Sequence, residues 1–276
     1  MAPNGHGQSE KTYEKEGNFH DAIEDCLDLS FHGKAGGWPY WHIDLNAGCG
    51  WNEAAACEGS PLVFLRAAIG RKRRFNACFC DRDKAALADL RGRALPLCPA
   101  FAPDCWLTFD GRNNAEALAA WGQKIAVSEK TKYAVGSVLC DPNGFRDRRD
   151  PRAGLPVEAL RRFAAIFPRI DLIFSLNISL FRFVGGHKEK QHAGFLDWPT
   201  AWEAVMSLGR PHWLVSNFRD RGKGHRFVVL LGRTSEEVRQ FRHFYPTDSA
   251  RGREVLQNLR TVRPDQPSFE GWEDIP

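Results

Sequence analysis

A short glycine-containing segment, Asp44-Leu45-Asn46-Ala47-Gly48-Cys49-Gly50, carries the sharpest chemical signal in the chain. It begins inside an apolar run, residues 40–45, that predicts a β-strand. A backbone that leaves a strand beside a small ligand needs glycine, because a side chain would block close approach and disfavour positive φ. The segment therefore predicts a turn that contacts a bound small molecule through Asp44, Asn46, Ala47, Gly48 and Gly50.

Acidic residues follow the next two predicted strands. Asp81 comes directly after the strand 75–80, and Asp110 comes after the strand 106–109. An acidic residue after the second strand of a nucleotide-binding fold hydrogen-bonds ribose hydroxyls, which is the role expected of Asp81. Asp83 competes for that role, but its place before a helix favours N-capping. Asp110 has the same two readings, ligand contact and helix cap.

A second polar turn, Asp141-Pro142-Asn143-Gly144-Phe145, follows the predicted strand 133–140. The turn combines acceptor oxygens on Asp141 and Asn143 with the aromatic ring of Phe145. These residue types are also those of an ordinary turn, and that structural reading stays open. Asp141, Asn143 and Phe145 are the candidate catalytic residues.

Strands and helices alternate along most of the chain. Helices are expected over 20–30, 60–69, 84–95, 115–127, 156–167 and 200–208, and a fifth strand over 171–176. This alternation predicts βαβ units and an α/β, Rossmann-like, doubly wound, mostly parallel sheet. Two close strands, 212–218 and 225–231, predict an antiparallel hairpin at its end. Ligands of such sheets bind beyond the carboxyl ends of the strands, where the polar turns lie.

The motif that begins at Asp44 resembles motif I of class I S-adenosylmethionine-dependent methyltransferases, and the parallel units closed by a hairpin resemble their fold. The resemblance implies S-adenosylmethionine as cofactor, with its methionine part against the 44–50 segment and its adenine amine near Asp110. It also relates the 141–145 turn to the Asp/Asn-Pro-Pro-aromatic motif of methyltransferases that act on amines of adenine or cytosine. Here Asn143 replaces the second proline and Phe145 lies one position late.

A closer resemblance, over residues 40–180, is to the three-Cys-motif partner proteins of bacteria and phages. Members carry Asp-Leu-Phe-Ala-Gly-Pro-Gly, then Gly-Ser-Pro-Leu, then Asp-Pro-Phe-Gly. This chain has related segments at 44–50, 59–62 and 141–144, in which Asn46, Cys49 and Asn143 replace Phe, Pro and Phe. The resemblance implies the same fold and cofactor pocket.

Two functions of different class follow. The first is methyl transfer from S-adenosylmethionine to a nucleic-acid base or nucleotide. The second is a catalytically silent methyltransferase-like module that binds nucleic acid or a partner protein. A nicotinamide oxidoreductase is disfavoured, because Gly48-Cys49-Gly50 is not continued into a full Gly-x-Gly-x-x-Gly.

Charge and composition set the remaining expectations. A net charge of +4 permits an acidic partner, and basic clusters at 71–74, 146–152, 188–190 and 219–226 could follow a phosphate backbone or be solvated loops. The eight cysteines show no Cys-x-x-Cys pair, so neither a disulfide nor a metal is expected. No signal-peptide core and no apolar run of about 18 residues is present, which predicts a cytoplasmic protein without a membrane partner.

The expected organisation is a disordered tail over 1–18, a single methyltransferase-like domain over 19–260 and an extended C-terminal tail over 261–276. The segment 183–200, rich in Gly, Lys and His, is expected to be an insertion in that domain.

Overall fold

The computed structural model describes residues 12–31, 38–53, 55–98, 105–128, 133–141, 155–177, 198–216, 227–235, 241 and 243–260. Its helices are α1 (Thr12–Phe31), α2 (Ser60–Gly70), α3 (Lys84–Ala94), α4 (Asn114–Ser128), α5 (Val157–Ile166), α8 (Trp198–Met206), α9 (Ala250–Arg260) and the 3-10 turn η2 (Leu95–Leu97). Its strands are β1 (Tyr40–Asp44), β2 (Trp51–Asn52), β3 (Cys57–Glu58), β4 (Phe75–Cys80), β5 (Trp106–Asp110), β6 (Val135–Cys140), β7 (Ile170–Asn177), β8 (His212–Ser216), β9 (Phe227–Arg233) and β10 (Phe244–Pro246).

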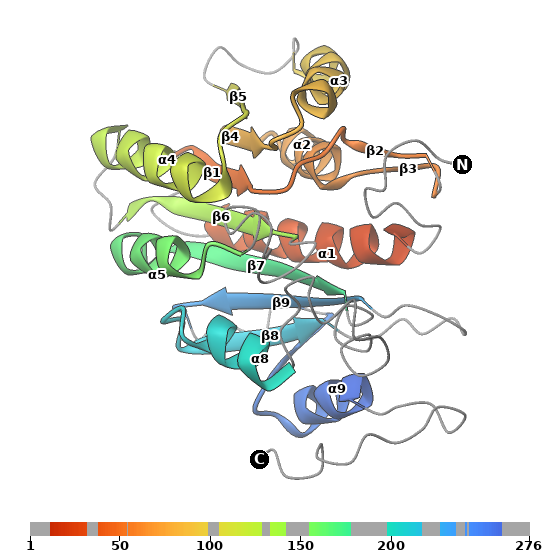
Figure 1. Cartoon of the computed structure of the whole chain (residues 1–276), viewed down its shortest axis with the longest axis vertical. Helices are drawn as coiled ribbons and strands as arrows, with labels where there is room; N and C mark the ends of the chain where they lie inside the picture. The colour runs from red at the N-terminus through yellow and green to blue at the C-terminus, as the bar shows by residue number, and fades with distance from the viewer. Residues whose placement is uncertain are drawn as a thin grey trace, which may run out of the picture.

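The described strands form one large sheet in the order β10-β8-β9-β7-β6-β1-β4-β5 (Figure 1), and β2 pairs separately with β3. Neighbours from β5 to β7 are parallel, whereas β9 is antiparallel to both β7 and β8. Because β1 lies in the middle of the five parallel strands and the chain winds outward on both sides of it, the sheet is doubly wound. The predicted fold class is confirmed, including the antiparallel pairing of β8 with β9.

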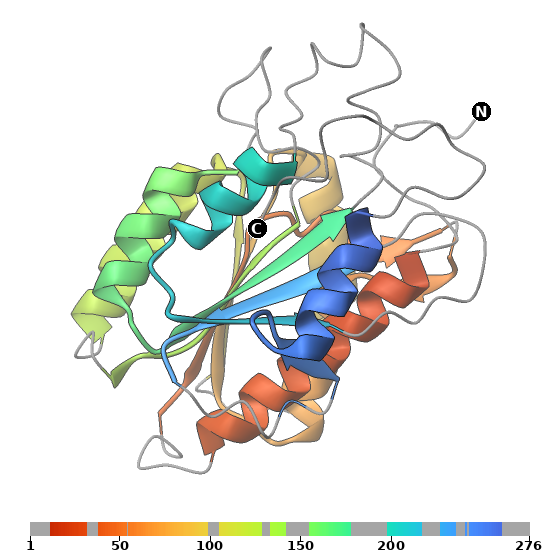
Figure 2. The ribbon, with the colours of Figure 1, turned by 90° about the horizontal axis from the view of Figure 1, so that it is seen from below.

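Helices cover the two faces of the sheet (Figure 2). Alternate side chains of the central strand β1 pack on the two faces. Trp41 and Ile43 pack into the core beneath α4 and α5. Tyr40 packs on the opposite face, beneath α1 and α2, where the ring of His42 stacks on Phe64 with centroids 3.9 Å apart. Burial lowers the pKa of His42 to about 3, so this histidine is neutral.

The first helix, α1, begins at Thr12, earlier than the periodicity of the sequence predicts. Residues 12–18, predicted to be part of a disordered tail, are therefore helical. Glu16 and Asn18 are buried, so packing against the protein extends a helix whose polar sequence gives no amphipathic signal. Residues 1–11, much of the expected insertion 183–200 and the tail 261–276 lie outside the described residues.

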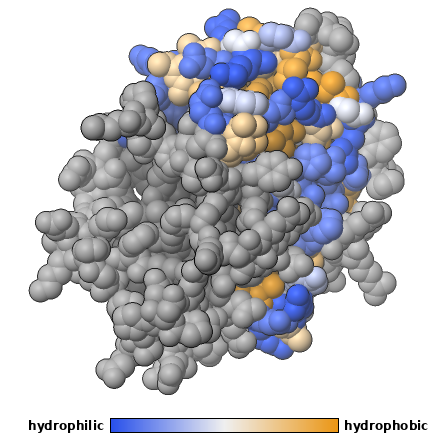
Figure 3. All heavy atoms as spheres, turned by 90° about the vertical axis from the view of Figure 1, so that its right-hand side faces the viewer, coloured by the Kyte–Doolittle hydropathy of each residue, from blue (hydrophilic) through white to orange (hydrophobic). Residues whose placement is uncertain are grey.

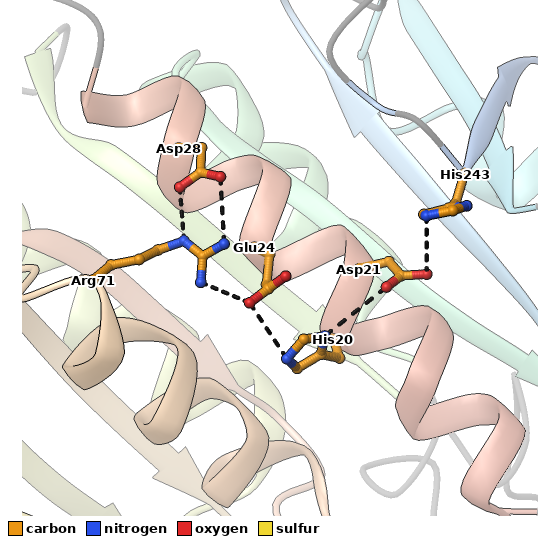
Figure 4. A network of polar contacts seen from close by, with 6 residues as sticks. All are labelled: His20, Asp21, Glu24, Asp28, Arg71 and His243. Atoms are coloured by element: carbon orange, nitrogen blue, oxygen red, sulfur yellow. Dashed lines mark hydrogen bonds and ion pairs between the residues drawn. The ribbon is translucent and has the colours of Figure 1, made fainter.

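Ion pairs fasten α1 to the end of α2 (Figure 4). The Arg71 guanidinium donates to Asp28 through Nε at 2.7 Å and to Glu24 through Nη1 at 2.7 Å. On another side of α1, Asp21 Oδ2 lies 4.0 Å from His243 Nε2. Arg71 belongs to the basic cluster 71–74, and Arg73 of the same cluster is only 3% exposed. Part of this cluster therefore serves the fold, and is neither a solvated loop nor a free basic surface.

A buried arginine holds the end of α5. Arg210 donates to the carbonyl oxygens of Ala164, Phe167 and Ile170 at 2.9, 3.0 and 2.7 Å. A cation at a helix C-terminus is favourable, and its removal would leave several carbonyls without a donor.

We expect Arg210→Ala to lower the free energy of unfolding by about 3 kcal/mol or more, because each buried polar group left unsatisfied costs about 1–3 kcal/mol. Urea denaturation followed by circular dichroism measures the change. The matched control is Arg162→Ala. The Arg162 side chain is 76% exposed and pairs with Glu158, so its removal should cost less than about 0.5 kcal/mol of stability. Equal losses in the two variants would contradict the role given to Arg210.

The other differences from the predicted elements lie mainly at the ends of the chain and in loops. The segment 51–59, for which no element was expected, contains the pair β2–β3, and the C-terminal part adds β10 and α9. Among the described helices, none combines the length and the apolar character that crossing a membrane requires.

Candidate functional site at the carboxyl ends of β1, β4, β5 and β6

The register of the sheet brings four polar chain segments to one edge. Asp44 pairs with Phe79 on one side and with Leu139 on the other, and Cys80 pairs with Asp110. The segments that follow β1, β4, β5 and β6 therefore leave the sheet together. In Figure 1 the arrows of β4 and β7 point toward the right-hand side of the molecule. Figure 3 shows that side, on which the coloured residues are mostly hydrophilic with hydrophobic residues between them.

The turn after β1 is held by backbone hydrogen bonds to β4. The Ala47 N–H donates to the Cys80 carbonyl at 2.9 Å, and the Gly48 N–H donates to Asp81 Oδ2 at 2.8 Å. Gly48 has a φ of +58°, and a Cβ built on it would meet no atom within 4 Å. Glycine is required here for its backbone conformation, and the space beside its α-carbon is open.

Gly50 also has a positive φ, and it has a second reason to be glycine. Its φ is +72°, and a Cβ built on it would lie 2.5 Å from Leu90 Cδ1 of α3. Its carbonyl accepts from the Gly59 N–H at 2.8 Å, and this hydrogen bond joins the two ends of the segment that contains β2 and β3. Gly50 therefore lets the turn pack on α3, and of these two glycines Gly48 is the one that borders open space. The sequence pattern predicted that both glycines lie in a turn beside a ligand, but it could not distinguish these two roles.

Asp81 fixes the geometry between the turns. Besides the Gly48 N–H, its carboxylate accepts from the Asp83 N–H through Oδ1 at 2.9 Å. A carboxylate offers about four lone-pair sites, so Asp81 keeps acceptor capacity for a further donor. Asp83 instead caps α3, where it accepts from the N–H groups of Ala85 and Ala86. The expectation that Asp83 is the cap is confirmed.

Asp44 lies below the turn and is fully buried. Its Oδ1 accepts from the Asn46 N–H at 3.0 Å, and its Oδ2 accepts from the Ser60 hydroxyl at 2.7 Å. The pKa of Asp44 is raised to about 7, mainly by burial and to a smaller extent by the charges of Asp141 and Glu16, while the hydrogen bonds from Ser60 and Asn46 oppose the rise. Three carboxyl groups from α1, β1 and the end of β6 thus influence one another.

Asn46 links the first turn to the end of β6. Its Oδ1 accepts from the Asp141 N–H at 3.2 Å, so two segments about a hundred positions apart in the sequence are joined at the site. Asp141 is half-buried. Asn143 and Phe145, the other candidate catalytic residues, lie outside the described residues.

Asp110 is engaged by its own turn. It is 6% exposed, and Arg112 donates to its carboxylate through the backbone N–H, Nε and Nη2. Burial raises the pKa of Asp110, but these hydrogen bonds and the positive charge of Arg112 outweigh it and hold the pKa below its ordinary value. An adenine amine would have to share this carboxylate with Arg112.

Three site residues were missed by sequence reasoning: Ser60, Arg112 and Glu16. Ser60 lies in the Gly-Ser-Pro-Leu segment, so that motif was a signal for it. Arg112 stands two positions after Asp110 and shows no pattern. Glu16 depends on the position of α1 across the sheet, which no local signal reveals.

No model of a known protein family matches this chain, and no curated protein matches it. Solved structures are similar in fold. An S-adenosylmethionine-dependent methyltransferase from Agrobacterium tumefaciens has 10% identity and a TM-score of 0.45, over 82% of this chain and 62% of its own. The magnesium protoporphyrin IX methyltransferase of Synechocystis PCC 6803 has 12% identity and a TM-score of 0.42, over 83% and 86%.

The methyltransferase domain of METTL16 has 14% identity and a TM-score of 0.42, over 80% of this chain and 83% of its own. This chain therefore spans less than two thirds of the Agrobacterium chain and most of the other two. The fold given above follows from the strand order of this chain, and the candidate site follows from its own contacts. The chain has a Rossmann-like, doubly wound α/β fold with its polar turns gathered at one edge.

Proposed function

We propose that this protein binds S-adenosylmethionine at the turn after β1 and transfers its methyl group to an amine of a nucleic-acid base or nucleotide. The observation that carries the proposal is the open space beside Gly48, with the Gly48 N–H fixed by Asp81. Bare backbone beside open space, next to a carboxylate with spare acceptor capacity, suits the ribose and methionine parts of such a cofactor.

The charge at the site supports the same cofactor. Asp44, Asp141 and Glu16 lie near enough for their charges to interact, and this concentration of acid favours a cation. S-adenosylmethionine carries a positive sulfonium and a positive ammonium group. Buried Asp44 holds the turn through Asn46 and Ser60, whereas half-buried Asp141 and Asp81 are the groups that can reach a ligand.

The cofactor, when bound, supplies an activated methyl group, so the chain has mainly to align donor and acceptor. Asn46, Ala47 and Gly50 shape the turn and Asp81 holds it. Asp141 would accept a hydrogen bond from the acceptor amine and orient its lone pair, with Asn143 and Phe145 as further contacts to that substrate. Asp110 borders the adenine end together with Arg112.

The proposal includes the resemblance to the three-Cys-motif partner proteins. That resemblance rests on segments 44–50, 59–62 and 141–144. The Asp44–Ser60 hydrogen bond, 2.7 Å long, joins the first two of these segments, and the Asp141–Asn46 contact joins the first and third. Direct hydrogen bonds thus join the three segments, which supports the proposal that they serve one site.

Incubation of the protein with methyl-labelled S-adenosylmethionine and separate pools of RNA, DNA and nucleotides tests the proposal. We expect label in one nucleic-acid or nucleotide pool, and a loss of about 100-fold or more in Asp141→Ala, the range seen when a group that handles the reacting proton or amine is removed. Asp89→Ala, an exposed substitution of the same type on α3, is the matched control and should keep full activity.

Protein that binds the cofactor but labels no pool would contradict the enzymatic proposal and favour the catalytically silent module that binds nucleic acid or a partner protein. Full activity in Asp141→Ala would contradict the role given to Asp141.

A further inference from the structure

Three side chains whose atoms can bind a metal ion lie close together on one face of the sheet, opposite the face that carries Asp44 and Ser60. The ligand atoms of Cys78, Cys80 and Asp110 all lie within 4.8 Å of one another, and the two sulfur atoms are 3.4 Å apart. The cysteines are fully buried and Asp110 is 6% exposed. The function proposed above uses neither thiol.

The sheet geometry explains why these atoms meet. Cys78 and Cys80 are two positions apart on β4, so their side chains point to the same face. Cys80 is in parallel register with Asp110 of β5, which places the Asp110 carboxylate beside the Cys80 thiol. Because the third group comes from a strand 30 positions further on, the spacing of the cysteines alone gave no sign of a ligand set.

We propose that Cys78, Cys80 and Asp110 bind one thiophilic divalent metal ion such as Zn²⁺. Thiolate and carboxylate are both zinc ligands, and Zn–S bonds of about 2.3 Å in a tetrahedron place two sulfurs about 3.8 Å apart. The observed 3.4 Å separation is within a few tenths of an ångström of that value. On binding, each thiol releases its proton to solvent and each sulfur donates an electron pair to the metal.

Arg112 completes the electrostatics of this site. It donates to Oδ1 of Asp110 through its backbone N–H and Nε, and to Oδ2 through Nε and Nη2, so a metal ion at this carboxylate would replace one of these four contacts. Two thiolates, one carboxylate and a divalent ion sum to a charge of −1, and the guanidinium neutralises it. An outer partner that orients a ligating carboxylate is a regular feature of metal sites. The fourth position of the tetrahedron would be taken by water.

The site adjoins the proposed cofactor turn and shares Asp110 with the proposed adenine end. The Asp81 N–H donates to the Asp110 carbonyl at 3.1 Å, so an ion at Asp110 would stiffen the ends of β4 and β5 that support Asp81. A metal ion at Asp110 would exclude a hydrogen bond from the adenine amine to that carboxylate, so with the metal bound the role of Asp110 at the adenine end would pass to another acceptor.

Titration of the reduced, chelator-treated full chain with Co²⁺ tests the proposal, with Zn²⁺ displacement as confirmation. We expect one equivalent of Co²⁺ and a thiolate-to-cobalt absorption band in the near ultraviolet that Zn²⁺ removes. The band should disappear in Cys78→Ser and Cys80→Ser, and Asp110→Asn should weaken binding at least about 10-fold. Cys140→Ser removes a buried thiol from β6 outside the cluster and should bind as the wild type does.

Thermal unfolding with and without Zn²⁺ keeps the test decisive if a cysteine variant fails to fold. An ion that binds the native state raises the melting temperature of the wild type at stoichiometric concentration. Folded wild-type protein that binds neither Co²⁺ nor Zn²⁺, or a band that survives in a folded double variant of Cys78 and Cys80, would overturn the proposal. Neither readout involves S-adenosylmethionine, so this inference can fail while the proposed function stands.

Discussion

Gly48→Trp is expected to weaken the binding of S-adenosylmethionine by about 100-fold or more, which corresponds to about 2.7 kcal/mol. A Cβ at this position meets no atom within 4 Å, so the indole would project into the space assigned to the cofactor. Equilibrium dialysis with labelled cofactor, on variant and wild type side by side, measures the change.

Two variants separate the effect of bulk in the pocket from other effects of the substitution. Gly48→Ala imposes the same penalty on a φ of +58°, about 1–2 kcal/mol, while it adds only one methyl group to the open space. Gly92→Trp adds the same indole to an exposed position of α3 where a Cβ also meets nothing. We expect binding to survive in both. Unchanged affinity in a folded Gly48→Trp protein would place the cofactor elsewhere.

Asp44→Asn is expected to remove a large pH dependence of stability. The folded pKa of Asp44 is about 7, well above its ordinary value, so the folded state favours the neutral carboxyl. The stability that this group contributes is present below about pH 4 and is lost as the pH rises toward 7. Over that window the wild type should lose on the order of 4 kcal/mol relative to the variant.

Urea denaturation of both proteins between pH 4.5 and 7.5 measures the difference. The comparison cancels the contributions of other groups, such as His42, whose lowered pKa acts in the opposite direction. A difference in free energy that does not change with pH would contradict the burial and charge environment given to Asp44.

The same carboxyl should couple pH to cofactor affinity. A cationic ligand near Asp44 favours its ionised form, so the affinity of the wild type for S-adenosylmethionine should rise between pH 6 and 8. The rise should be smaller for S-adenosylhomocysteine, which lacks the sulfonium charge, and absent in Asp44→Asn. Calorimetric titration at three pH values distinguishes these cases, and identical slopes for the two ligands would contradict the coupling.

The features predicted correctly from the sequence are those written in local residue patterns. The glycines that follow the strand ending at Asp44 occupy turn positions with positive φ, which few residue types adopt. Asp83 shows the signature of a helix cap, and the hairpin of β8 and β9 shows two close apolar runs. These signals need only neighbouring residues.

The features that were missed depend on contacts between distant segments. Helix α1 extends to Thr12 because Glu16 and Asn18 are buried by the rest of the protein, which their polar character does not suggest. The role of Gly50 depends on Leu90 of α3, and the cluster at Cys78 depends on the register between β4 and β5. Register and packing are set by the whole sheet, so local periodicity could not supply them.

Isothermal titration of the wild-type protein with S-adenosylmethionine at pH 8 tests the central claim most directly. At that pH Asp44 is ionised, and the site should have its highest affinity for a cation. We predict saturable binding of one equivalent with a dissociation constant in the micromolar range, shared in weaker form by S-adenosylhomocysteine. Folded protein that produces no binding heat, and no shift in melting temperature with the cofactor at millimolar concentration, would contradict the assignment of a cofactor pocket to the turn at Gly48.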